Sequence, residues 1–516
     1  IYGRILGVPV YVVRDATDLR ETLASLRDKS LLRLTAEGRY DMHTFIRQFA
    51  HEKHGEDEEL LLRHAAWAFQ WLAAETPALQ LAHNAALTRT ATELQNLRLA
   101  WDTALHHARA DLLAPALPGL EGFYTARSGY AEMTEAFQNA AVAFPAETHP
   151  ALHARLRVGQ GVGLYRQGRA QDAYAVLEQA YHLSLQLDPT VPPALRATCA
   201  LHVGIAHLFL SRYEDARTYL EEARTLARQI GDTLLEAHVL RNFAIIHTEK
   251  GQLEEAYRLT ETSLGLYQAA GNELGAAIAT VNLSTTAHYL GRHAQLQQFA
   301  EEALARGKAL ENRSVTSLAL SNLGLAAFAR KEYVEALRFY EEAKKIYEDI
   351  GNPVDIARTE ITIANALQEL ARLPEAIALH KHALKTLQEA GQRWLAVLTL
   401  NNLGSAYLHA GDDEQARRYL AQGLQEAQEI EAETLAHAAL LGFADLAVRQ
   451  GQVETGARLA AFVRHVSGDD FENQEGADKL LARTKEKFSA EGFARSMEAG
   501  QQLTLKETVK FVSEQL

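Results

Sequence analysis

Residues 248–256 read "TEKGQLEEA", and segments of the same kind return along the chain at a nearly constant interval, as "FARKEYVEA" at 328–336 and "LHAGDDEQA" at 408–416. Each contains a turn residue in fourth place. Eight such turn residues can be aligned: Gly168, Ser211, Gly251, Gly291, Lys331, Ala371, Gly411 and Gly451. The first gap is 43 residues and every later gap is 40, while Gly129, 39 residues before Gly168, indicates a ninth, more divergent unit. A fixed period of this length is typical of repeat architectures.

Small side chains recur at fixed places on both sides of these turns. Ala stands five residues after six of the eight turns. Seven residues before the turns come Gly161, Gly204, Ala244, Ser284, Gly324, Ala364 and Gly404. Because a larger side chain would push two helix axes apart, this pattern predicts that two helices cross closely in each unit. A second Gly at 231, 271, 351 and 391 keeps the same step and predicts the end of each second helix.

The units therefore predict an all-α fold, an α-solenoid superhelix of about eight to nine repeats over residues 111–458. The small-residue pattern resembles that of the tetratricopeptide repeat, although each unit is longer than the usual 34 residues. An array of HEAT-like repeats has a compatible period and is the alternative. The unit at 274–313 departs from the pattern, because Leu296 stands where Ala is expected.

Composition limits the possible functions. The 516 residues carry 52 Lys and Arg against 66 Asp and Glu, a formal charge of −14, which disfavours direct binding to nucleic acid or to an anionic membrane. Cys199 is the single cysteine, so neither an internal disulfide nor a cysteine zinc site is expected, and the cytoplasm is the expected location. No apolar stretch approaches the roughly 20 residues that cross a bilayer. The start, "IYGRILGVPV", suggests a piece of a longer protein.

In a solenoid of this kind the first helix of each pair is expected to line the concave side, and polar side chains gather there. Nine residues before the turns stand His202, Asn242, Asn282, Asn322, Thr362 and Asn402. We call this row the polar ladder. Asn is a poor helix former, so helix propensity does not explain the row. One interpretation is that each amide caps or cross-links neighbouring helices. The other is a row of donors and acceptors that faces a peptide or a small polar ligand.

Neighbouring positions on the same helices extend this candidate binding groove. They are His238, Arg241, Arg358, Asn365 and Asn401. The guanidinium groups of Arg241 and Arg358 suit a carboxylate or another anion, since the fork matches two oxygens; a solvated charge or a local ion pair is the alternative.

Residues 18–53 do not follow the period. They predict a helix ending near Lys29, a strand in "SLLRL", a strand in "RYDM" and a helix from Thr44. This order, with "RYDMHTFIRQFAHE", resembles the winged-helix domain that follows the nucleotide-binding module of STAND-type NTPases, a group that includes NB-ARC proteins. The family carries a Met-His-Asp motif here whose His contacts the β-phosphate of ADP. The resemblance implies this sensing role for Met42 and His43 in an intact protein, with Thr44 in place of the Asp.

The tail, "EGFARSMEAGQQLTLKETVKFVSEQL" at 491–516, resembles the end of bacterial STAND regulators with tetratricopeptide sensors, through Phe493, Gly500 and Leu503. It is expected to cover the last repeat. Helical segments between 60 and 110 resemble the linker of the same family. The predicted organisation is therefore a winged-helix domain (1–53), a helical linker (54–110), repeats (111–458) and a helical cap (459–516).

Motifs for catalysis are absent from the sequence. There is neither a GxxxxGK[ST] phosphate loop nor a GxSxG nucleophile elbow, and "HEKH" at 51–54 misses the HExxH zinc spacing. We expect no enzyme, no metal and no cofactor in this chain, while the resemblance implies ADP or ATP and Mg²⁺ in a nucleotide-binding module of the same polypeptide. The leading hypothesis is the sensor half of a STAND regulator that binds a peptide, protein or small effector. A stand-alone peptide-binding adaptor is the alternative, and DNA binding by residues 1–53 is a weaker one.

Overall fold

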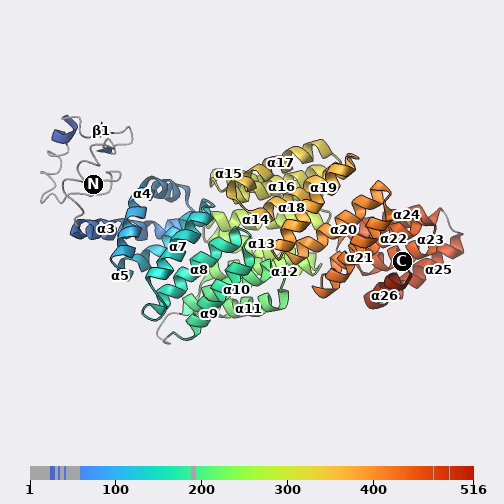
Figure 1. The fold of residues 1–516 in the computed structure, drawn as a ribbon, viewed down its shortest axis with the longest axis horizontal. Helices are drawn as coiled ribbons and strands as arrows, with labels where there is room; N and C mark the ends of the chain where they lie inside the picture. Colours follow the sequence, from blue (N-terminus) through green and yellow to red (C-terminus); the bar gives the residue numbers. More distant parts are fainter. Residues whose placement is uncertain are drawn as a thin grey trace. The chain divides into compact units, whose positions relative to one another are not determined.

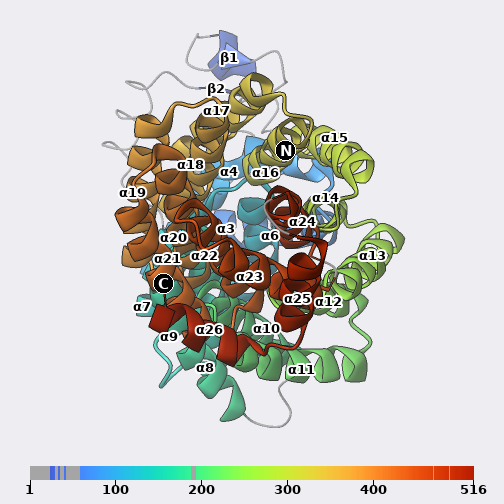
Figure 2. The ribbon, with the colours of Figure 1, turned by 90° about the vertical axis from the view of Figure 1, so that its right-hand side faces the viewer.

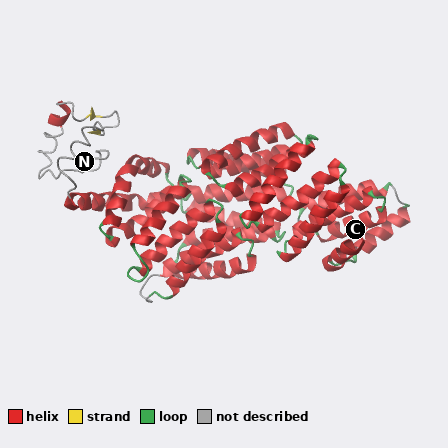
Figure 3. Ribbon diagram, in the orientation of Figure 1, coloured by secondary structure: helices red, strands yellow, loops and turns green. Residues whose placement is uncertain are grey.

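A computed structural model describes residues 24–28, 33–34, 40–41, 58–187, 193–468, 470–486 and 489–515. Within these ranges the chain is helical apart from one pair of short strands (Figures 1 and 3). It divides into two compact units, Ile1–Gln160 and Gly161–Leu516, with the division inside α8 (Pro150–Arg166). None of the described helices is both long and apolar enough to span a membrane.

The second unit is a run of helix pairs with the predicted period. The even-numbered helices are the first of each pair and the odd-numbered helices the second. They are α9 (Ala170–Leu185), α10 (Pro193–Phe209), α11 (Tyr213–Ile230), α12 (Thr233–Glu249), α13 (Leu253–Ala269), α14 (Glu273–Tyr289), α15 (His293–Ala309), α16 (Arg313–Ala329), α17 (Tyr333–Ile350), α18 (Pro353–Glu369), α19 (Leu373–Glu389), α20 (Arg393–Ala410), α21 (Asp413–Glu429), α22 (Glu433–Arg449) and α23 (Val453–Val466). This confirms the predicted tetratricopeptide-like α-solenoid.

Every one of the eight aligned turn residues has a positive φ, between 55° at Ser211 and 84° at Gly451. The period therefore marks the single residue of each turn that must take the left-handed conformation. The prediction for the ninth unit is wrong by one residue. Gly129 has φ −84°, whereas Ser128 has φ 56° and lies 40 residues before Gly168. Glycine identity was the misleading signal there, and the constant spacing was the better guide.

Close crossing within each pair is confirmed at the small residues. A methyl group built on Gly324 of α16 would lie 2.3 Å from the Tyr340 ring of α17, and one on Gly404 of α20 would lie 2.6 Å from Leu420 of α21. In the irregular unit the hydroxyl of Ser284 donates to the Leu296 carbonyl at 2.9 Å, and the Leu296 side chain is buried. The larger residue is accommodated because it fills the core between Ala287 and Ala326.

Successive turns of this solenoid touch one another. The Asn352 amide at the start of α18 donates to the Arg166 carbonyl at 3.0 Å, across 186 residues of sequence. Likewise, the Gln392 amide before α20 donates to the Phe209 carbonyl at 2.8 Å, across 183 residues. Figure 2 shows α11, α13, α15, α17 and α19 on the outside of this unit, with α12, α14, α16 and α18 nearer its centre. The first helices thus form the inner layer, as expected.

Three helices follow the last pair: α24 (Phe471–Lys485), α25 (Ala490–Gln501) and α26 (Leu505–Gln515). Phe493, Met497, Leu503 and Val509 pack against the apolar cluster that α22 and α23 bury. A methyl group on Gly500 would lie 2.5 Å from the Arg458 carbonyl of α23, so the tail sits tightly against that helix. The tail therefore covers the apolar face of the final repeat, which the end of a solenoid requires.

The first unit contains α3 (Glu58–Gln80), α4 (Asn84–His106), α5 (Ala110–Leu113), the 3-10 turn η1 (Ala114–Ala116), α6 (Leu117–Ala126) and α7 (Tyr130–Ala143). Ahead of them, β1 (Arg33–Leu34) and β2 (Tyr40–Asp41) form an antiparallel pair in the region where the two strands were predicted. Residues 24–28 are helical. The rest of the predicted winged-helix domain, with Met42 and His43, lies outside the described residues.

Candidate functional site on the inner helices

The candidate site is the inner face of the second unit, which we define as the first-helix surface that carries the predicted polar ladder. His202, Asn282, Thr362 and Asn402 are partly exposed there, on α10, α14, α18 and α20. Asn242 and Asn322, at the same position of α12 and α16, are buried. The ladder thus has two kinds of member.

The buried amides have structural partners. Asn322 Nδ2 donates to the Val281 carbonyl and to the Thr285 hydroxyl of α14, both at 3.1 Å. Asn242 Nδ2 donates at 2.7 Å to the His238 carbonyl of its own helix. Asn401 is likewise buried, and its amide reaches the Leu435 carbonyl of α22 at 2.8 Å. Asn322 thus joins neighbouring helices, as the first interpretation of the ladder expects, and Asn401, predicted as a groove position, also joins two helices.

The partly exposed amides are different. Asn282, Asn365 and Asn402 have no hydrogen-bond partner for their side chains among the residues that the structure describes. Each presents one acceptor and two donors on the inner face, free to bind a ligand. Sequence position alone does not separate these amides from the cross-linking ones, because the difference depends on the neighbouring helix.

The two arginines predicted to bind anions are also in different situations. Arg358 Nη2 lies 2.8 Å from Asp355 Oδ1 of the same helix, α18, and 3.1 Å from the Tyr347 hydroxyl, so its guanidinium group is already engaged. Arg241 of α12 is 8% exposed and has no ion-pair or hydrogen-bond partner in the described part of the chain. His238 stands one turn before it on the same helix. Only Arg241 therefore keeps its predicted capacity for an anion.

Further titratable groups that the sequence did not single out lie at the ends of these helices. Burial raises the pKa of Glu249, the last residue of α12, to about 8, and a hydrogen bond with Tyr213 opposes the rise. His288 Nε2 lies 3.1 Å from Glu472 Oε1 of α24 and so links α14 to the helices that follow the last pair. Glu249 follows Asn242 by seven residues, so a heptad step from the ladder would have found it; no local pattern predicts the partner of His288.

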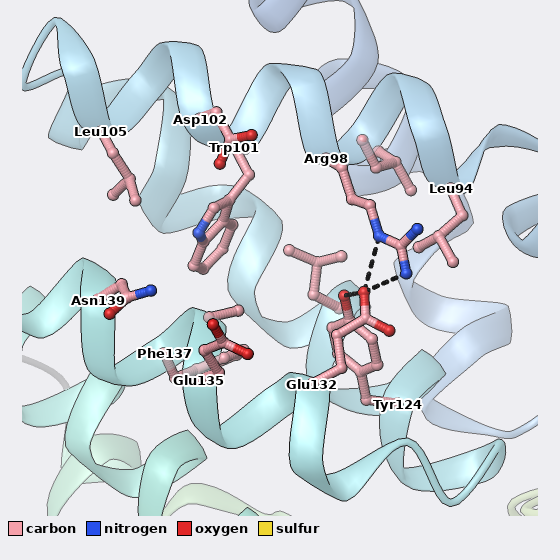
Figure 4. Close-up of a pocket in the computed structure, with 13 residues that line it drawn as sticks. Leu94, Arg98, Trp101, Asp102, Leu105, Tyr124, Glu132, Glu135, Phe137 and Asn139 are labelled. Carbon is pink, nitrogen blue, oxygen red and sulfur yellow. Dashed lines mark hydrogen bonds and ion pairs between the residues drawn. The ribbon is translucent and has the colours of Figure 1, made fainter. Parts of the chain in front are cut away.

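The first unit has a separate cavity of about 220 Å³ between α4, α6 and α7 (Figure 4). Trp101 and Phe137 lie in it with ring centroids 5.7 Å apart, and at one end Arg98 pairs with Glu132, which also accepts from the Tyr124 hydroxyl at 3.0 Å. The charged groups of this end satisfy one another, and the cavity is not among the predicted sites. Within the described ranges no group of three or more His, Cys, Asp or Glu side chains is arranged to hold a metal ion.

Comparison with known proteins agrees with the geometry. A tetratricopeptide repeat family model matches residues 195–269, 275–349 and 355–429. The chain carries tetratricopeptide repeats. This match decides against the HEAT-like alternative, and it covers the inner helices α10 to α20, on which most of the candidate site lies.

The chain is similar to three proteins of known name or structure. Regulatory protein AfsR of Streptomyces griseus is 26% identical over 423 residues, which is 80% of this chain and 39% of that protein. The crystal structure of a Rap protein complexed with Competence and Sporulation Factor has a TM-score of 0.53 at 15% identity, over 70% of this chain and 99% of that chain. The structure of a Signal Transduction ATPase with Numerous Domains protein with a tetratricopeptide repeat sensor, from Pyrococcus horikoshii, has a TM-score of 0.45 at 18% identity. The match covers 81% of this chain and 60% of that chain. The chain spans about two fifths of AfsR and is similar to that part of a regulatory protein.

Proposed function

We propose that this chain is the sensor module of a STAND-type regulator and that it binds a peptide or a protein segment on its inner face. The observation that carries the binding role is the set of partly exposed amides without partners in the described part of the chain, Asn282, Asn365 and Asn402, on three first helices. An extended peptide has one donor and one acceptor per residue, and side-chain amides can match both.

The regulatory role is supported by the similarity to part of Regulatory protein AfsR and by the resemblance of the chain's two ends to STAND regulators. In this proposal the winged-helix segment, with Met42 and His43, packs on a nucleotide-binding module of the same polypeptide. ADP, ATP and Mg²⁺ would be bound by that module. A ligand that prefers one nucleotide state would shift the balance between the two states in proportion to its difference in affinity.

The binding role can be tested with a library of fluorescent octapeptides and anisotropy. We expect members of the library to bind the whole chain, and the double variant Asn282→Ala/Asn402→Ala to weaken the selected peptides by at least tenfold. Gln425→Ala, which removes an exposed amide from the outer helix α21, is the matched control and should bind normally. If the double variant bound the peptides with unchanged affinity, the inner face would not be the binding surface.

The regulatory role needs a different experiment, because a plain adaptor would bind peptides equally well. In a polypeptide that also contains the proposed nucleotide-binding module, the peptide affinity of this chain should depend on the bound nucleotide. We expect ADP and a non-hydrolysable ATP analogue to change that affinity in opposite directions. Peptide binding that ignores both nucleotides would favour the stand-alone adaptor.

A further inference from the structure

Arg241 lies on the inner face, and the fold gives its guanidinium group no partner among the described residues. Its side chain is buried, with 8% exposure, yet no carboxylate, carbonyl or hydroxyl group among the described residues pairs with it. Arginine is almost never fully buried without a partner, because removing its charge from water is costly. The guanidinium group of this largely buried side chain therefore keeps all its donors available for an anion.

Two histidines on first helices belong to the same candidate groove as Arg241. His238 precedes it by one turn of α12, and the His238 ring packs on the Tyr267 ring of α13 with centroids 5.3 Å apart. On the neighbouring first helix, α10, His202 Nδ1 lies 3.1 Å from the Tyr165 hydroxyl of α8. These imidazoles add two groups that can donate a hydrogen bond to an anion.

The charge of Arg241 acts on two of its neighbours, His238 and Tyr267. Burial, and to a smaller extent the positive charges of Arg241, His202 and Arg166, lower the pKa of His238 to about 3. Burial also raises the pKa of Tyr267, while the charges of Arg241 and Arg166 oppose that rise. The charges that act on His238 are all positive. Arg358 provides the contrast, since Asp355 beside it on α18 supplies the anion that Arg241 lacks.

We propose that Arg241, assisted by His238 and His202, binds a carboxylate group of the ligand that occupies the inner face. The guanidinium fork offers two parallel N–H donors that match the two oxygens of a carboxylate, and a buried site strengthens such charge-assisted bonds. The proposal deepens the proposed function and names the part of the ligand that is held. The carboxylate is the C-terminus of a peptide, an acidic side chain or a free dicarboxylic acid.

A purely structural arginine would behave differently on replacement. Arg241→Met keeps the apolar stem and removes a buried charge that has no partner among the described residues, so the ligand-free variant should melt at the same temperature as the wild type or above it. A structural arginine would lower the melting temperature when removed. Arg241→Lys keeps a charge but loses the fork, and it should lose most of the carboxylate binding.

The test is a thermal-shift titration of the whole chain with succinate and with inorganic phosphate, each compared with sodium chloride at equal ionic strength. We expect succinate to raise the melting temperature of the wild type by about 2 °C or more at saturation. The shift should vanish in Arg241→Met and persist in Arg258→Met, which removes an exposed arginine of the outer helix α13. The proposed site is refuted if succinate does not shift the melting temperature of the wild type, or if it shifts that of Arg241→Met by the same amount. An Arg241-dependent shift that is larger with phosphate overturns the carboxylate assignment.

Peptides selected from the octapeptide library identify the source of the carboxylate. Each is synthesised with a free C-terminus, as the C-terminal amide, and with Asp and Glu changed to Asn and Gln. The proposal is supported if one of the two neutralised forms binds the wild type at least tenfold more weakly than the parent peptide. The Arg241→Met variant should then bind both forms with the same affinity. Equal affinities of all forms for both proteins overturn it and leave peptide binding standing. If no peptide binds while the succinate shift depends on Arg241, the anion site stands and the peptide function fails.

Discussion

Replacing Glu249 with Gln should make the protein more stable at alkaline pH. Glu249 ends α12, and its Oε2 atom is buried without a hydrogen-bond partner in the described part of the chain. Burial raises its pKa to about 8 from an ordinary 4.5, while a hydrogen bond with Tyr213 opposes the rise. The folded state therefore holds a proton that the unfolded state releases.

The direction and the size of this change in stability follow from the linkage between proton binding and folding. A carboxyl group whose pKa is raised on folding contributes stability that is fully present below pH 4.5 and is lost as the pH rises through 8. At 1.36 kcal/mol per pKa unit, the difference between the two values sets a ceiling of ~5 kcal/mol. Because the Glu249 side chain keeps partial access to solvent, we expect about 2 kcal/mol at pH 9.

Urea unfolding, followed by circular dichroism at pH 5, 7 and 9, provides the assay. The free energy of unfolding of Glu249→Gln should be close to that of the wild type at pH 5 and exceed it at pH 9. Glu261→Gln, at an exposed position of α13, is the control and should follow the wild type at every pH. A Glu249→Gln variant that is no more stable than the wild type at pH 9 would show that the carboxyl group is not buried as described.

Three further tests address the packing and the ladder. Gly324→Ala should lower the free energy of unfolding by about 1–3 kcal/mol, because its methyl group meets the facing helix. Gly265→Ala, with open space around it, should raise the free energy of unfolding by about 0.5–1 kcal/mol. Similar values for the two variants in denaturant unfolding would refute the close crossing. Asn322→Ala should cost about 1–3 kcal/mol because it leaves buried acceptors unpaired, while Asn402→Ala should leave the melting temperature unchanged and weaken peptide binding. Asn352→Ala should cost about 1–2 kcal/mol, since this side chain caps α18 and also joins two turns of the solenoid; an unchanged melting temperature would contradict both contacts.

The solenoid was predictable because each repeat is specified locally. The positive φ of a turn residue and the close approach at Gly324 leave marks that any single unit shows, and the period repeats those marks. The turn of the ninth unit shows the limit of residue identity. Ser128 takes the left-handed conformation and Gly129 does not, so the constant spacing was more informative than the type of residue.

The candidate site was predictable only as a surface. The ladder position locates the inner face, but it does not separate Asn322, which joins two helices, from Asn402, which has no partner in the described part of the chain. That distinction depends on the side chains of the adjacent repeat. Contacts between turns of the solenoid, such as that of Gln392 with the Phe209 carbonyl, span 183 residues and follow from the superhelical geometry rather than from any local pattern.

Photo-crosslinking tests most directly whether the inner helices recognise a ligand. The whole chain is irradiated with an octapeptide library in which every member carries a benzophenone side chain, and the attachment points are mapped by mass spectrometry. If the inner helices recognise the ligand, the peptides should attach to α12, α14, α18 and α20, and the signal should be lost in Asn282→Ala/Asn402→Ala. Attachment confined to the outer helices or to the first unit, or none at all, would contradict recognition by the inner helices.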